Sequence, residues 1–257
     1  MSRFINLELG QLNEDHSERH TVAKDETFYL REAQIAYESA DFERGLRSYA
    51  RVLEHNPQNP MAWTGQVRML IELNEVNEAK LWADKALERF PKESRLLAAK
   101  AVALGRRGDL EEALAFSDAA FEERGDSSDL WLARGDVFLA RKEKRSHFCF
   151  EKAVSQAHQS WFDRWLAARI LHWHQQHASA FKYAASAVEA NPAACVAWLQ
   201  LGLCQRELGL TGAAESSFSR ATELNPDCSG AITARQGLTT QSVWTQVRKS
   251  LRRLFSS

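Results

Sequence analysis

The chain has 257 residues, of which 44% are hydrophobic and 10% aromatic, so it holds enough apolar side chains for a core and is not disordered throughout. Its 33 basic and 34 acidic residues nearly cancel, which argues against a chain built chiefly to bind nucleic acid. Glycine (12) and proline (5) are together about half as frequent as in average proteins, which disfavours turn-rich β-sandwiches and barrels and favours a helical protein.

The cysteines and the apolar stretches indicate the compartment. The four cysteines are Cys149, Cys195, Cys204 and Cys228. Zinc sites and redox dithiols use close pairs such as C-x-x-C, so we expect reduced thiols, no metal and no cofactor. The first apolar stretch is interrupted by Asn6 and Glu8, unlike a signal peptide, and no stretch approaches the ~20 apolar residues of a transmembrane helix. These features predict a cytoplasmic protein.

Residues 1–25 are expected to form a flexible, acidic arm, and a repeat of 34 residues follows it. Pro57 and Pro91 lie 34 residues apart, and so do Pro192 and Pro226. The spacing from Pro91 to Pro192 is one residue short of three periods, so one unit lacks a residue, which we place in a turn near residues 142–144. The predicted units are 26–59, 60–93, 94–127, 128–160, 161–194 and 195–228.

Small residues recur at fixed positions of these units, which allows two helices to approach closely. The eighth position holds Ala33, Val67, Ala101, Gly135, Ala168 and Gly202, and positions twenty and twenty-seven are similarly small. Large residues such as Phe150 and Phe218 at position twenty-four fill the remaining space. Each unit is therefore predicted to be a helix–turn–helix that buries its apolar face only by stacking on its neighbours.

The pattern in the last unit closely resembles a tetratricopeptide repeat: Trp198, Gly202, Ala214, Phe218, Ala221 and Pro226. The resemblance extends in phase over residues 26–228, with departures such as Arg164 where the family has tryptophan. It implies an all-α, right-handed superhelical solenoid that is usually a scaffold and not an enzyme. It also implies a concave groove, lined by the first helix of each unit, that holds partner peptides or helices.

The family's groove positions carry polar and aromatic residues in this chain. Four arginines have the planar fork that binds carboxylates and are candidates for an acidic peptide: Arg68, Arg95, Arg106 and Arg169. Trp165 and Trp173 are candidate anchors for an apolar side chain. The other candidates are Gln34, Tyr37, His172 and Arg206. Alternatively, the charges form a solvated face and the tryptophans lie in the core between repeats.

Motifs for catalysis are missing from the sequence. It has no G-x-x-x-x-G-K-[ST], G-x-S-x-G or H-E-x-x-H pattern, so we expect no catalytic residue and no small-molecule substrate. His172, His174 and His177 cluster near a predicted helix end, with no acidic residue or cysteine between them. We expect these histidines to interact with the last carbonyls of the helix and not to bind a metal.

Residues 229–257 are predicted to hold a capping helix over 229–238 and a basic amphipathic helix over 241–255. The apolar stripe of the second helix consists of Trp244, Val247, Leu251, Leu254 and Phe255, and its basic residues are Arg248, Lys249, Arg252 and Arg253. This helix either packs back as a second cap, docks into a partner or another copy of the chain, or lies on an anionic membrane surface.

Together these features predict a non-catalytic adaptor that binds other proteins in its groove and through its C-terminal helix. One alternative is a peripheral membrane scaffold that uses residues 241–255. A helical-repeat nucleic-acid binder is the other, but acidic groove residues such as Glu72, Asp129 and Asp136 would interrupt a basic surface, so we expect no nucleic acid.

Overall fold

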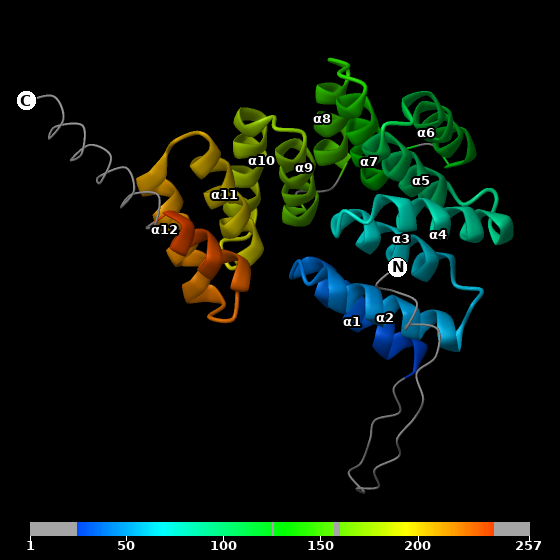
Figure 1. The fold of residues 1–257 in the computed structure, drawn as a ribbon, viewed down its shortest axis with the longest axis horizontal. Helices are drawn as coiled ribbons and strands as arrows, with labels where there is room; N and C mark the ends of the chain where they lie inside the picture. The colour runs from blue at the N-terminus through cyan, green and yellow to red at the C-terminus, as the bar shows by residue number, and fades with distance from the viewer. Residues whose placement is uncertain (1–24, 125, 157–159, 239–257) are drawn as a thin grey trace, which may run out of the picture.

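The computed structural model describes residues 25–124, 126–156 and 160–238, and these residues form helices and turns with no strand among them. Six helix pairs follow one another: α1 (Glu26–Glu38) and α2 (Phe42–His55), α3 (Pro60–Glu72) and α4 (Val76–Arg89), α5 (Ser94–Arg107) and α6 (Leu110–Arg124), α7 (Ser128–Ala140) and α8 (Ser146–Gln156), α9 (Trp161–Trp173) and α10 (His177–Ala190), α11 (Cys195–Glu207) and α12 (Thr211–Leu224). Figure 1 shows the pairs stacked along a curved path from α1–α2 to α11–α12. The predicted all-α solenoid of helix–turn–helix units is confirmed.

Helix starts follow from the local sequence. The side chains of Asp25, Asp41 and Asn59 each accept a hydrogen bond from the backbone N–H three residues further on, which satisfies a donor that the first turn leaves unpaired. Pro60 opens α3, where its missing N–H costs nothing. The odd-numbered helices begin at residues 26, 60, 94, 128, 161 and 195, which are the first residues of the predicted units.

One backbone conformation recurs in the turn of every pair. The fifteenth residue of each unit is left-handed, with φ between 57° and 101°: Ala40, Asn74, Gly108, Lys142, Gln175 and Gly209. The following N–H bonds the carbonyl five residues earlier, as from Asp41 to Ala36 (2.9 Å). This pattern is a Schellman-type helix end, so the same turn is built six times although only two of the six residues are glycine.

The residue missing from the fourth unit is absorbed at the start of α8. In the second unit the Glu75 carbonyl accepts from the N–H of Ala79, four residues on. At the equivalent place in the fourth unit the Glu143 carbonyl accepts from Ser146, only three residues on (3.2 Å). The tighter turn shortens α8 while Ser146 and Ala153 still reach buried positions.

The small positions are buried where the helices of a unit touch. An added Cβ on Gly135 would lie 2.8 Å from Phe150 Cζ, and one on Gly202 would lie 2.5 Å from Phe218 Cε1. The phenylalanine at position twenty-four therefore packs directly against the backbone of the first helix, which explains the paired small and large residues of the repeat.

The last pair is covered by the terminal helical segment, residues 229–238. Ala234 and Leu238 of this segment pack with Ala214 and Phe218 of α12, so the segment closes the open end of the solenoid as predicted. Within the described ranges, no helix has both the length and the apolar character needed to span a membrane. The predicted amphipathic helix over 241–255, with all its contact residues, lies outside the described residues.

Candidate partner-binding groove

A pocket lies at the centre of the surface formed by the odd-numbered helices. Its walls come from α1, α3, α5, α7 and α9, and its volume is about 520 Å³, counting space open to solvent. The apolar part of this central pocket consists of Ile71, Ala99, Val102, Leu132, Ala133, Leu166 and Ile170. The polar part consists of Tyr37, Arg68, Glu72, Arg106, Asp129 and Asp136.

The first ion pair of the pocket centres on Asp129. Arg68 Nη2 and Arg95 Nε each lie 3.0 Å from Asp129 Oδ2, and Ser127 Oγ donates to the other carboxylate oxygen at 2.6 Å. Burial raises the pKa of Asp129, but Arg68, Ser127 and Arg95 together lower it to about 2. Asp129 therefore stays charged, and it holds two of the predicted groove arginines.

The second ion pair is more deeply buried. Arg106 Nη2 and Nε donate to Asp136 Oδ2 at 2.7 and 3.1 Å, and the side chains of the two residues are only 4% and 1% exposed. His174 Nε2 lies 2.8 Å from the other oxygen of Asp136. Burial raises the pKa of Asp136, but Arg106 and His174 hold it below its usual value. His174 thus contacts a carboxylate of another unit, and not the helix-end carbonyls that we expected.

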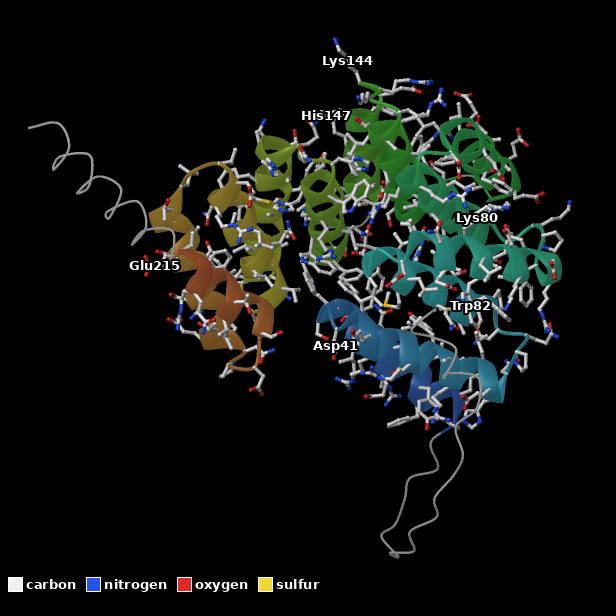
Figure 2. The ribbon with its side chains drawn as sticks, in the orientation of Figure 1. Asp41, Lys80, Trp82, Lys144, His147 and Glu215 are labelled. Carbon is white, nitrogen blue, oxygen red and sulfur yellow. The ribbon has the colours of Figure 1, made fainter. Side chains whose placement is uncertain are left out.

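A third set of contacts joins the first two units to the fifth. Arg169 donates to Glu72 Oε2 through Nη2 (2.5 Å) and Nε (3.0 Å), although the two residues are 97 positions apart. The Arg169 guanidinium also stacks over the Phe42 ring at 4.7 Å, and Tyr37 meets Phe162 edge to face at 5.1 Å. Figure 2 labels Asp41, in the turn between α1, which carries Tyr37, and α2, which begins at Phe42. We call this set the cross-groove contacts.

The two predicted tryptophan anchors lie at different depths. Trp165 is 1% exposed and its Nε1 donates to the Val196 carbonyl at 3.2 Å, so its ring belongs to the core between α9 and α11 and offers no surface to a partner. Trp173 is 41% exposed and its ring lies 4.7 Å from the Arg106 guanidinium.

The other three candidates pair locally or are half buried. Gln34 bonds Glu38 (2.7 Å), and Arg206 bonds its neighbour Glu207 (2.9 Å). His172 lies 3.7 Å from the Cys204 sulfur, and burial lowers its pKa. No group of three or more histidine, cysteine or acidic residues within the described ranges could hold a metal ion.

Phe42 and the carboxylate partners were not recognised from the sequence as parts of one site. Glu72, Asp129 and Asp136 stood out only as interruptions of a basic groove. The spacing of Arg106 and Asp136 could have indicated that they meet. They lie on α5 and α7, the first helices of neighbouring units, at repeat positions that differ by about one helical turn. Phe42 carried no such signal, since its contact with α9 depends on the path of three intervening units.

Comparison with known proteins agrees with this architecture. Tetratricopeptide repeat family models match residues 30–94 and 196–228. A comparison of the sequence with curated proteins found no match. The chain is a tetratricopeptide repeat protein.

Solved structures with the same fold are distant in sequence. A tetratricopeptide repeat protein of Thermus thermophilus is 22% identical with a TM-score of 0.52, over 76% of this chain and 99% of that one. One from Parabacteroides merdae is 13% identical with a TM-score of 0.51, over 85% and 87%. The human IFIT1 dimer, solved with m7Gppp-AAAA, is 14% identical with a TM-score of 0.52, over 84% of this chain and 55% of that one.

Proposed function

We propose that this chain is a non-catalytic scaffold that holds one segment of a partner protein along its concave surface, with an apolar side chain of that segment in the central pocket. The tetratricopeptide fold supports a protein-interaction scaffold in general. The observation that carries the finer proposal is the pocket itself, which is concave, mainly apolar in its walls and shared by five helices.

The charges around the pocket decide which partner it suits. Arg68, Arg106 and Arg169 each face a carboxylate of the chain itself, so an acidic peptide would have to displace Asp129, Asp136 or Glu72. Breaking the buried pair of Arg106 and Asp136 would leave an uncompensated charge, which costs about 3–5 kcal/mol. An amphipathic segment with one large apolar anchor and few charges therefore suits this site better than the acidic peptide suggested by the arginines alone. A nucleic acid would likewise have to displace these carboxylates before its phosphates could reach the arginines.

A peptide-display selection tests the proposal. The wild-type chain is expected to select peptides that share a leucine, methionine or aromatic residue. Ala133→Phe fills the pocket from α7 and should lower the affinity for the selected peptides at least tenfold. Ala213→Phe is the matched control, because Ala213 is exposed on α12, far from the pocket walls. Circular dichroism checks that both variants remain folded. Equal affinity of wild type and Ala133→Phe would place the partner site elsewhere.

The three alternative roles of the predicted helix over 241–255 can be separated by truncation. Truncation after Leu238 removes the basic segment and leaves the terminal helical segment, which packs on α12. Loss of sedimentation with anionic vesicles would support the membrane alternative, and loss of self-association in analytical ultracentrifugation would support docking into another copy. A lower melting temperature with neither loss would support a second cap.

A further inference from the structure

Two cysteine side chains meet in the last repeat. Cys195 is the first residue of α11, and Cys228 immediately precedes the terminal helical segment. The side chains of Cys195 and Cys228 are hydrogen-bonded to each other. Both side chains are partly exposed, whereas Cys149 and Cys204 are buried. The two sulfurs are thus in contact at a place that small molecules in solution can reach.

The repeat geometry explains why these two residues meet. Cys195 and Cys228 occupy positions one and thirty-four of the sixth unit. The same positions of the first unit hold Glu26 and Asn59, and there Asn59 Nδ2 donates to Glu26 Oε1 at 2.6 Å. The fold therefore brings the first and last side chains of a unit face to face in two independent places. The contact between the cysteines thus has a counterpart at the equivalent positions of the first unit.

The surroundings of Cys228 favour its thiolate. The hydrogen bond from Cys195 lowers the pKa of the Cys228 thiol, burial opposes this change, and the backbone N–H of Ala231 lowers the pKa further. Ala231 lies in the first turn of the terminal helical segment, where unpaired N–H groups and the helix dipole attract negative charge. The same hydrogen bond, together with burial, raises the pKa of Cys195. The pair thus consists of a nucleophilic sulfur and an adjacent thiol.

We propose that Cys195 and Cys228 form a redox-modification site, in which a peroxide converts the two thiols to a disulfide that ties the start of α11 to the start of the terminal helical segment. The Cys228 thiolate attacks a peroxide oxygen, so that an S–O bond forms and the O–O bond breaks. With hydrogen peroxide, this step takes up one proton and gives a sulfenic acid and water. Cys195 then attacks that sulfur, the S–S bond forms, and the hydroxyl group leaves with the Cys195 proton as a second water. Two thiols and one hydrogen peroxide thus give one disulfide and two waters, and a dithiol reductant reverses the oxidation.

The disulfide would close a ring over α11 and α12. It links the two ends of one repeat unit, next to the start of the terminal helical segment, whose Ala234 and Leu238 pack with Ala214 and Phe218. The ring holds the two ends of the sixth unit together, so this unit has less conformational freedom when it unfolds. The oxidised chain is therefore expected to melt several degrees higher at its C-terminal end than the reduced chain.

The full-length chain and hydrogen peroxide itself provide the test. After treatment and unfolding, thiol titration should fall from four free thiols to two, and dithiothreitol should restore four. Tryptic digestion without reductant should yield peptides 183–206 and 221–235 joined by a bond, two hydrogen masses lighter than their sum. The first peptide contains both Cys195 and Cys204, so fragmentation must place the bond on Cys195.

Single substitutions separate this site from general oxidation. Cys195→Ser should give no disulfide but a sulfenic acid on Cys228 that dimedone traps, and its melting temperature should not rise with peroxide. Cys204→Ala is the matched control and should keep the disulfide and the rise. Four remaining thiols after treatment, a bond to Cys204, or a covalent dimer on a non-reducing gel would each overturn the proposal.

Discussion

The buried contact of Arg106, Asp136 and His174 makes a strong prediction about stability. Replacing Asp136 by alanine removes the acceptor for three hydrogen bonds from residues that are themselves 4% and 9% exposed. The Arg106 charge would then stay buried without a carboxylate partner. Breaking a buried ion pair in this way costs about 3–5 kcal/mol, a large share of the 5–15 kcal/mol that stabilises an ordinary domain. Arg106→Met should cost a similar amount, because it leaves Asp136 with His174 alone.

The double variant Arg106→Met/Asp136→Leu should be far less damaging than either single change. Apolar side chains of similar volume fill the site and no charge remains, although His174 loses its acceptor at a cost of about 1 kcal/mol. We expect the free energy of unfolding of the double variant to lie within about 2 kcal/mol of the wild-type value. The two single variants together should lose about 4 kcal/mol or more beyond the loss of the double variant, and this difference is the coupling energy of the pair.

Urea unfolding followed by far-ultraviolet circular dichroism measures these free energies. The exposed pair of Arg206 and Glu207, at 34% and 37% side-chain exposure, is the control, and its single alanine variants should change stability by less than about 1 kcal/mol. If Asp136→Ala costs less than about 1 kcal/mol, or if the double variant costs the sum of the singles, the contact does not hold the groove as described.

Three further outcomes are expected. The Asp129 pKa of about 2, against 3.8 for a free group, means that its stabilisation of about 2 kcal/mol is complete above about pH 4 and lost as pH falls towards 2. Asp129→Asn should therefore destabilise the chain at pH 7 but not at pH 2 in urea titrations, and an equal loss at both would contradict the assignment. Ala40→Gly should raise the free energy of unfolding by about 0.5–1 kcal/mol, because Ala40 has a left-handed φ of 57° that glycine adopts without strain. An unchanged urea midpoint would speak against strain at this residue. Gly202→Ala should cost about 1–3 kcal/mol through its clash with Phe218 and lower the melting temperature, and wild-type melting would refute that packing.

The repeat and its helices could be predicted from the sequence because the signals are local. A period of 34 residues, small residues at fixed positions and Asn-Pro pairs at unit ends determine where helices begin and which faces they bury. The missing residue of the fourth unit was placed near 142–144, and the structure shows the shortened turn between Glu143 and Ser146. The family assignment followed from the same pattern.

The state of the groove could not be predicted in this way. The arginines were identified, but their neutralisation depends on how the units turn relative to one another. Glu72 and Arg169 are 97 positions apart, and no spacing within one unit implies that they touch. Trp165 illustrates the same limit, because a groove position and a core position differ only by a small rotation of α9 about its axis.

The cross-groove contacts change how the array should respond to force and to denaturant. In a solenoid whose units touch only their neighbours, any stretch can separate while the rest stays intact. Here the Arg169–Glu72 and Tyr37–Phe162 contacts connect the fifth unit directly to the first two units. The first five units are therefore linked at both ends of the series and not only from one neighbour to the next. The first five units should then lose structure together, whereas the sixth unit, which packs between the fifth unit and the terminal helical segment and lacks such a long-range contact, can separate first.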